Sequence, residues 1–148
     1  MDTVHHYTVD LKWEQGRQGL LSSKELEQTI QVATPLPFPK GVEGIWSPEH
    51  LLTAAVSSCL LTTFLAIAEN FKLEFESFSC KATGKLDKPE GKYLITEILL
   101  EPHLVISNEK DIDLALKVLQ KSEVACLISN SIKSTVHMKP EIVISALA

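Results

Sequence analysis

The sequence predicts an α+β fold with a mainly antiparallel sheet and one long central helix. Three observations lead to this prediction. Apolar and polar residues alternate over residues 7–13, with the period of a half-buried strand. Residues 51–68 carry no charged side chain and follow a strong helix start. Predicted strands cluster before and after this helix instead of alternating with helices, which is typical of α+β architecture.

The N-terminal third is predicted to contain two strands, a turn and a long loop. Residues 7–13 form the first expected strand, and Gly16-Arg17-Gln18-Gly19 follows as a turn. A second strand is expected over residues 29–33. Residues 34–47 hold three prolines and two glycines, which break regular structure and predict a loop. Loops of about 12 or more residues in compact domains are often functional.

The long helix is predicted to begin at Ser47. A serine N-cap, Pro48 at the first helical position and Glu49 in the first turn are three favourable signals for a helix start. The uncharged stretch that follows approaches the length of a membrane span. Its five serine and threonine side chains favour the alternative, the central helix of a soluble core. We therefore expect no membrane association.

The C-terminal half is predicted to contain a hairpin, two helices and a closing strand in one domain that spans residues 1–148. The expected elements are strands at 72–86 and 92–106, helices at 109–121 and 122–129, and a strand at 132–144. Asn108 is the expected N-cap of the first of these helices. Pro140 is expected to interrupt the last strand.

Composition and charge exclude several classes of function. The formal net charge is −5 and no run of basic residues occurs, so we expect no nucleic-acid partner. Three cysteines are too few for a disulfide scaffold, and no signal peptide is evident, so a cytoplasmic location is expected. None of the five histidines pairs with cysteine at zinc spacing, so neither a metal nor a cofactor is expected.

The candidate reactive group is Cys59, in the middle of the uncharged helix. A free cysteine at such a position is often only a small buried side chain. A reactive thiol requires a lowered pKa, which a nearby cation could supply, and this helix contains none. Arg17, the single arginine beside thirteen lysines, is one candidate for that cation. Cys80 is in phase with the apolar residues of its strand and is expected to pack in the core.

Trp46 and His50 are the expected substrate-binding residues. Trp46 lies at the end of the predicted loop, and His50 follows Glu49 in the first turn of the predicted helix. Both positions adjoin the helix that carries Cys59.

Three segments resemble the signatures of one family, the OsmC/Ohr proteins. They are Ser47-Pro48-Glu49-His50-Leu51-Leu52 with the later Ser58-Cys59, then Ala125-Cys126-Leu127-Ile128-Ser129-Asn130, and Gly16-Arg17-Gln18-Gly19. The last of these is similar to the turn of the Ohr branch. The resemblance covers nearly the whole chain in element order and cysteine spacing. It implies an OsmC/Ohr-like domain that forms an intertwined homodimer.

The resemblance also implies an activity and a role for each matching residue. The family reduces organic hydroperoxides through thiols, with Cys59 at the position of its peroxidatic cysteine and Cys126 at that of its resolving cysteine. Arg17 would contact the reactive thiol, and Glu49 would hold the guanidinium. An external dithiol, typically of the lipoyl type, would reduce the Cys59–Cys126 disulfide. The family often has proline after the second cysteine, where this chain has Leu127.

Two other functions are weighed against the peroxidase. A non-catalytic dimer that keeps the fold is suggested by Leu127 and by the unusual loop. A Cys-His hydrolase has less support, because no motif places a histidine beside Cys59. One geometric point also stays open. Glu49 and Cys59 are about 15 Å apart along an unbroken helix, so Arg17 would have to bridge them unless the helix begins irregularly.

Overall fold

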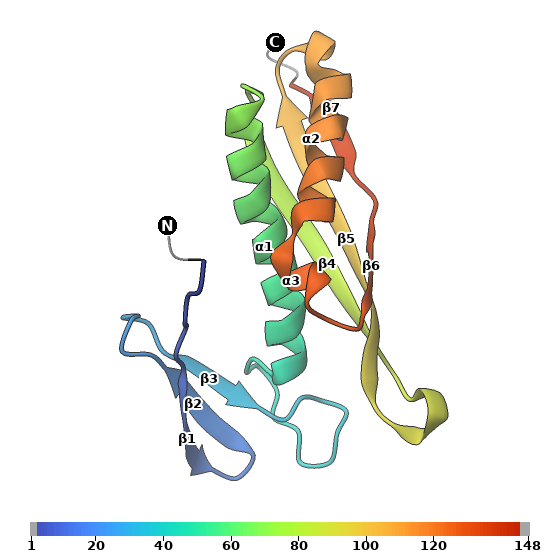
Figure 1. Ribbon diagram of the computed structural model, residues 1–148. Helices are drawn as coiled ribbons and strands as arrows, with labels where there is room; N and C mark the ends of the chain where they lie inside the picture. The colour runs from blue at the N-terminus through green and yellow to red at the C-terminus, as the bar shows by residue number, and fades with distance from the viewer. Residues whose placement is uncertain (1–2, 146–148) are drawn as a thin grey trace. The chain divides into compact units, whose positions relative to one another are not determined.

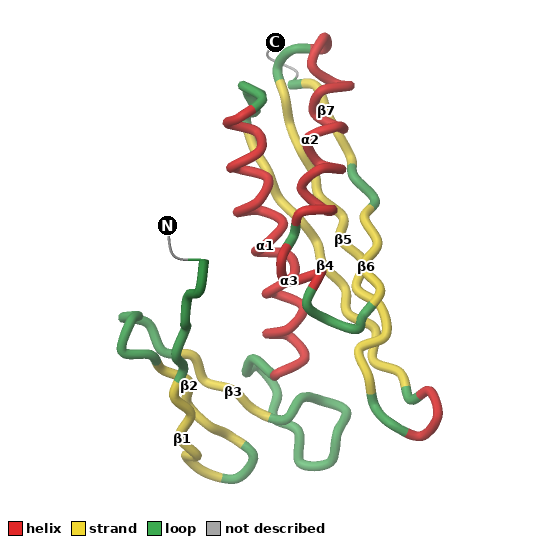
Figure 2. The backbone as a smooth tube through the Cα atoms, in the orientation of Figure 1, coloured by secondary structure: helices red, strands yellow, loops and turns green. Residues whose placement is uncertain are grey.

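The computed structural model describes residues 3–145, and its internal contacts divide the chain into two compact units, residues 1–51 and 52–148. Helices and strands are arranged as a mixed α+β fold with one long helix, as predicted (Figures 1 and 2). The prediction of one domain over residues 1–148 stays a prediction.

The first unit contains a three-stranded antiparallel sheet of β1 (Asp10–Gln15), β2 (Gln18–Ser22) and β3 (Ile30–Ala33). Strand β2 is absent from the sequence prediction because it begins inside the expected turn. The turn is only two residues long, and Gly16 adopts a φ of +49°, which allows the tight reversal. The expectation that the first strand is half-buried is wrong within this chain, since every side chain of β1 is exposed.

The predicted loop at residues 34–47 is closed at its base by backbone contacts. The N–H of Ala33 donates to the carbonyl of Trp46 at 2.8 Å, and Val32 forms a parallel bridge with Trp46. Within the loop, the N–H of Val42 donates to the carbonyl of Thr34 at 2.9 Å. These bonds satisfy backbone groups that the proline-rich loop would otherwise leave unpaired.

Helix α1 (Pro48–Asn70) begins at the predicted residue and runs without interruption. Ser47 is the N-cap, because its Oγ accepts the N–H of His50 at 3.1 Å. By length and composition α1 could cross a bilayer. Its buried side chains Val56, Leu60 and Phe64 nevertheless pack in the two apolar clusters of the second unit, which is how a core helix packs.

The second unit contains a sheet in which β5 (Leu94–Ile106) is central. Strand β4 (Ser77–Asp87) pairs with it antiparallel through the predicted hairpin, closed by a short 3₁₀ turn at Pro89–Gly91. The predicted closing strand is split near Pro140 into β6 (Thr135–Met138) and β7 (Glu141–Ile144), as expected. Both halves pair parallel with β5, one after the other, which the sequence did not indicate.

Helices α1 and α2 (Ile112–Ala125) cover one face of this sheet (Figure 1). Asn108 accepts the N–H of Lys110 and begins a 3₁₀ turn, Glu109–Asp111, which leads into α2. The prediction of a separate helix over residues 122–129 is wrong in its first half, because α2 continues to Ala125. The backbone is extended at Cys126, which ends α2, and α3 (Leu127–Asn130) follows.

Burial along α1 leads to a stability prediction. Leu60 is fully buried, whereas Leu65 on the same helix is 44% exposed. We expect Leu60→Ala to lower the free energy of unfolding by about 2–5 kcal/mol, because it leaves a cavity in the core. The matched variant Leu65→Ala should cost about 1 kcal/mol or less. Chemical denaturation measures both, and equal losses would contradict this packing.

Candidate active site

The candidate reactive thiol is buried inside the second unit, close to a second cysteine. Cys59 is in the middle of α1 and is 9% exposed. Cys126 is 1% exposed and is the residue at which the chain passes from α2 to α3. The two cysteines are adjacent, since their side chains form a hydrogen bond. The fold therefore brings together two residues that are 67 positions apart.

The surroundings of Cys59 favour its thiolate. Burial is the largest influence on the pKa of this thiol and raises it. Hydrogen bonds act in the opposite direction and come from the N–H of Ile128, the thiol of Cys126, the hydroxyl of Thr63 and the N–H of Leu127. The Thr63 hydroxyl lies 3.8 Å from the sulfur. The donors outweigh burial, so the pKa of Cys59 is below the ordinary cysteine value.

The pKa of Cys126 moves the other way. Burial is again the largest influence and raises it, and the neighbouring Cys59 sulfur raises it further through its charge and hydrogen bond. Hydrogen bonds from the side chain and backbone of Ser129 only partly offset this. The two thiols therefore differ: ionisation is favoured at Cys59 and disfavoured at Cys126.

Leu127 contributes a donor that proline would lack. It is the first residue of α3, and its N–H stabilises the Cys59 thiolate. Proline has no N–H, so the usual residue of the resembling family could not make this bond. The departure of this chain from the family pattern therefore adds one hydrogen bond to the thiolate.

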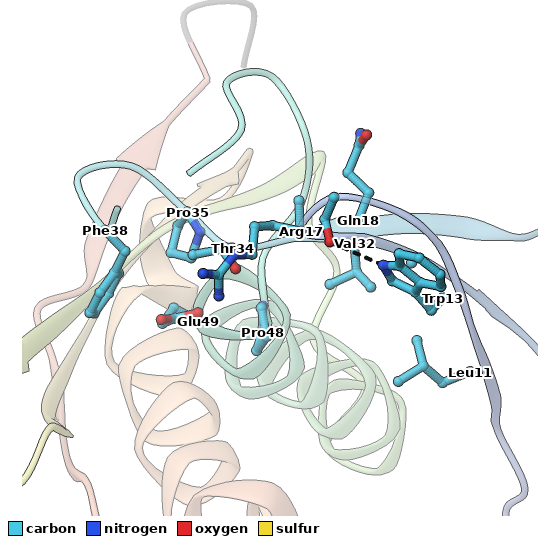
Figure 3. A pocket seen from close by; sticks show the side chains of 13 residues that line it. Leu11, Trp13, Arg17, Gln18, Val32, Thr34, Pro35, Phe38, Pro48 and Glu49 are labelled. Carbon is cyan, nitrogen blue, oxygen red and sulfur yellow. Dashed lines mark hydrogen bonds between the residues drawn. The ribbon is translucent and has the colours of Figure 1, made fainter. Parts of the chain in front are cut away.

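Arg17 and Glu49 line a pocket of about 450 Å³ inside the first unit, here called the Arg17 pocket. The guanidinium and the carboxylate point toward one another (Figure 3). The remaining lining is mostly apolar and includes Leu11, Trp13, Val32, Ala33, Pro35, Phe38 and Pro48. The Arg17 backbone is held in place because its carbonyl accepts the N–H of Thr34 at 3.2 Å. The pocket therefore combines a charged pair with an apolar wall.

Trp46 and His50 lie together in a separate small hollow of about 280 Å³. Their rings meet edge to face with centroids 6.2 Å apart. Ser47 Oγ lies 2.6 Å from Nδ1 of His50 and fixes the orientation of the imidazole. Neither residue is among those that line the Arg17 pocket. Their predicted role in substrate binding stays a prediction.

The predicted site residues thus fall into three groups: the two cysteines, the Arg17–Glu49 pair and the Trp46–His50 pair. The contact between Arg17 and Cys59 stays a prediction. Cys80 is half-buried against the core, as expected, and burial is the main cause of its raised pKa. Among residues 3–145, no three His, Cys, Asp or Glu side chains converge as a metal site.

Some residues of the site were not predicted from the sequence. The missed ones are Leu11, Trp13, Phe38, Thr63 and the backbone N–H groups of α3. Thr63 had a usable signal, since it lies four residues after Cys59 and shares its helix face. The α3 N–H groups had no such sequence signal, because the end of one helix and the start of another at Cys126 were not predicted.

Comparisons with known proteins identify one matching family and several similar structures. Residues 41–141 match the family described as OsmC-like protein. An uncharacterised protein of Bacillus subtilis, YmaD, is 27% identical over 142 residues and covers 93% of each chain. An OsmC-like protein of unknown function from Vibrio cholerae has a similar structure, with a TM-score of 0.84, 24% identity and coverage of 93% of this chain and 100% of that one.

An organic hydroperoxide resistance protein from Elizabethkingia anophelis also has a similar structure. Its TM-score is 0.74 at 20% identity, and the match covers 98% of this chain and all of the other. At this level of identity, the likeness shows a shared fold.

The Leu127 N–H generates a test of the thiolate environment. Proline fits at the first residue of a helix, and Cys126 already has the extended φ and ψ that proline requires of its predecessor. We expect Leu127→Pro to raise the pKa of Cys59, because one donor to the thiolate is lost. Leu127→Ala keeps the N–H and should leave the pKa unchanged. The pH profile of Cys59 alkylation by iodoacetamide, followed peptide by peptide by mass spectrometry, measures the shift. Identical profiles for the two variants would contradict this hydrogen bond.

Proposed function

Because the chain belongs to the OsmC-like protein family, we propose that it is a thiol-dependent peroxidase that reduces organic hydroperoxides to alcohols. The observation that carries the proposal is the asymmetric cysteine pair. Cys59 is favoured as a thiolate, and the adjacent Cys126 is favoured as a thiol. A two-cysteine peroxidase needs this difference in pKa, since the ionised sulfur attacks the peroxide first and the protonated sulfur reacts in the second step.

In the first step the Cys59 thiolate attacks the outer oxygen of the hydroperoxide. A sulfur–oxygen bond forms, the O–O bond breaks, and the hydroperoxide proton passes to the departing alkoxide to give the alcohol. Cys59 is oxidised to the sulfenate, and the peroxide is reduced by two electrons. The hydrogen bonds that stabilise the thiolate increase the fraction of reactive sulfur at neutral pH.

In the second step the Cys59 sulfenate takes up a proton from solvent, and Cys126 attacks the resulting sulfenic acid. A Cys59–Cys126 disulfide forms, and the oxygen leaves as water. The hydrogen bond between the two side chains supports this step, because the attacking sulfur is already adjacent. An external dithiol, of which a lipoyl group is one type, then reduces the disulfide by two successive exchanges and becomes a disulfide itself.

Arg17 and Glu49 are proposed to assist at the reactive thiolate. A guanidinium offers a planar fork of donors, and Glu49 would orient it. The apolar wall of the Arg17 pocket suits the alkyl part of a hydroperoxide, and Trp46 with His50 would contact the substrate. The proposed active form is a homodimer in the cytoplasm.

Cysteine variants test the reaction directly. We expect Cys59→Ser to abolish the consumption of cumene hydroperoxide in the presence of a dithiol, because the nucleophile is lost. Cys126→Ser should consume about one equivalent and then stop, because the sulfenic acid is not resolved by a disulfide within the chain. Cys80→Ser serves as the matched control and should remain active. Full turnover by Cys59→Ser, or no Cys59–Cys126 disulfide after peroxide treatment of the unmodified protein, would refute the proposal and favour a non-catalytic role.

The role of Arg17 has a separate test. Arg17→Lys keeps the charge but loses the fork of donors, so we expect kcat/KM for cumene hydroperoxide to fall by about tenfold or more. The thermal unfolding midpoint should stay close to that of the unmodified protein. Lys12→Ala removes a charge from β1 outside the Arg17 pocket and should have little effect. Unchanged kinetics in Arg17→Lys would remove this residue from the proposed machinery.

A further inference from the structure

A third concave surface lies in the second unit, between the end of α1 and α2. This groove has a volume of about 650 Å³. Its apolar floor includes Ile67, Phe71 and Val124, and the last of these is 76% exposed. Lys117 and Lys121 stand on its α2 side. None of these residues belongs to the Arg17 pocket or to the cysteine pair.

The two lysines converge on one aromatic ring. The Lys117 and Lys121 Nζ atoms lie 5.3 Å and 5.8 Å from the centroid of Phe71. The lysines are four residues apart on α2, and like charges at this spacing repel each other on a helix. Within residues 3–145, neither ammonium lies within 4.0 Å of a carboxylate. Among the described residues, two positive charges therefore face one aromatic ring with no carboxylate in ion-pair contact, in a chain whose net charge is −5.

The groove has an apolar floor and two ammonium groups, and one class of molecule could bind to both. Its floor offers apolar surface, which an alkyl chain would cover favourably. Its paired ammonium groups could bind the two oxygens of a single carboxylate. The volume lies within the usual range of small-ligand sites. We propose that this groove binds a single-chain carboxylate, with the carboxylate at Lys117 and Lys121 and the alkyl chain over Ile67, Phe71 and Val124.

The groove also borders the cysteine pair. One of its lining residues is Ala125, which directly precedes Cys126. Cys59, Thr63 and Ile67 follow one another at intervals of four residues on α1, and Phe71 comes directly after the helix at the same interval, so the four form one slowly turning stripe. A bound chain would lie on this stripe. The binding site does not depend on the proposed peroxidase activity, and its test requires no turnover.

Dodecanoate below its micelle concentration is the probe, and isothermal titration calorimetry of the full chain is the measurement. We expect saturable binding of about one dodecanoate per chain. Dodecyltrimethylammonium has the same alkyl chain with the opposite charge and should not bind. Lys117→Ala/Lys121→Ala should raise the Kd by about fivefold to thirtyfold, the effect of losing two exposed ion pairs. The matched variant Lys81→Ala/Lys133→Ala removes two exposed lysines elsewhere and should change the Kd by less than about twofold.

Three kinds of result would overturn the proposal. The first is equal binding of the cationic amphiphile, or an unchanged Kd in Lys117→Ala/Lys121→Ala. The second is binding to phosphatidylglycerol vesicles with none to monomeric dodecanoate, which would identify the surface as a membrane contact. The third is a pair of findings: the unmodified protein binds no dodecanoate, and the Lys117→Ala/Lys121→Ala variant has a different molar mass in light scattering. Together they would identify the groove as an interface between copies of the chain. Val124→Asp tests the floor: because Val124 is exposed, folding should persist while dodecanoate affinity falls.

Discussion

The structure of the second unit depends on the burial of one face of the uncharged stretch of α1, residues 52–68. Helix α1 places Val56 and Leu60 in one apolar cluster and Phe64 and Ala68 in the other, so it joins both halves of the core. A charged side chain on this stripe would cost several kcal/mol if left unpaired, on the order of the penalty for a buried ion. The same burial determines the depth of Cys59. A thiol at that depth is neutral unless the surrounding structure provides donors for its ionised form.

The donors observed here are mostly backbone and hydroxyl groups. From the sequence, a cation was the expected means of lowering the pKa of Cys59, with Arg17 as a candidate. Within the second unit, the N–H groups at the start of α3, the Cys126 thiol and Thr63 already outweigh the effect of burial. Fixed backbone dipoles stabilise charge without the reorganisation that a long flexible side chain requires. Arg17 would then add to an existing preference and bind substrate oxygen, instead of creating the thiolate alone.

Much of the fold was predictable because its signals are local. The Ser47-Pro48-Glu49 start, the proline-rich loop, the hairpin turn and the break near Pro140 each depend on a few adjacent residues. The missed features depend on distant partners. Strand β2 begins inside the predicted turn and is completed by pairing with β3, as between Gln18 and Ala33. The parallel pairing of β6 and β7 with β5 joins residues about 38 positions apart, such as Glu97 and Thr135. At the site, the cysteines were identified by their motifs. The α3 donors depend on the interruption of the helix at Cys126, which no residue pattern predicted.

The short helix α3 has its own dependence on chemistry at Cys59. Four residues make few internal hydrogen bonds, and the first N–H groups of α3 point to the Cys59 sulfur, which accepts from them most strongly when it is ionised. Any event that removes this charge, such as protonation or the formation of a covalent bond at sulfur, leaves those donors with a weaker acceptor. The side chain of Asn130 donates to the Val124 carbonyl and that of Ser131 donates to the Leu127 carbonyl, so the charge at Cys59 adds to bonds that already order this segment. A chemical change at one sulfur can then be transmitted through the backbone as a local loosening, next to the exposed side chain of Leu127.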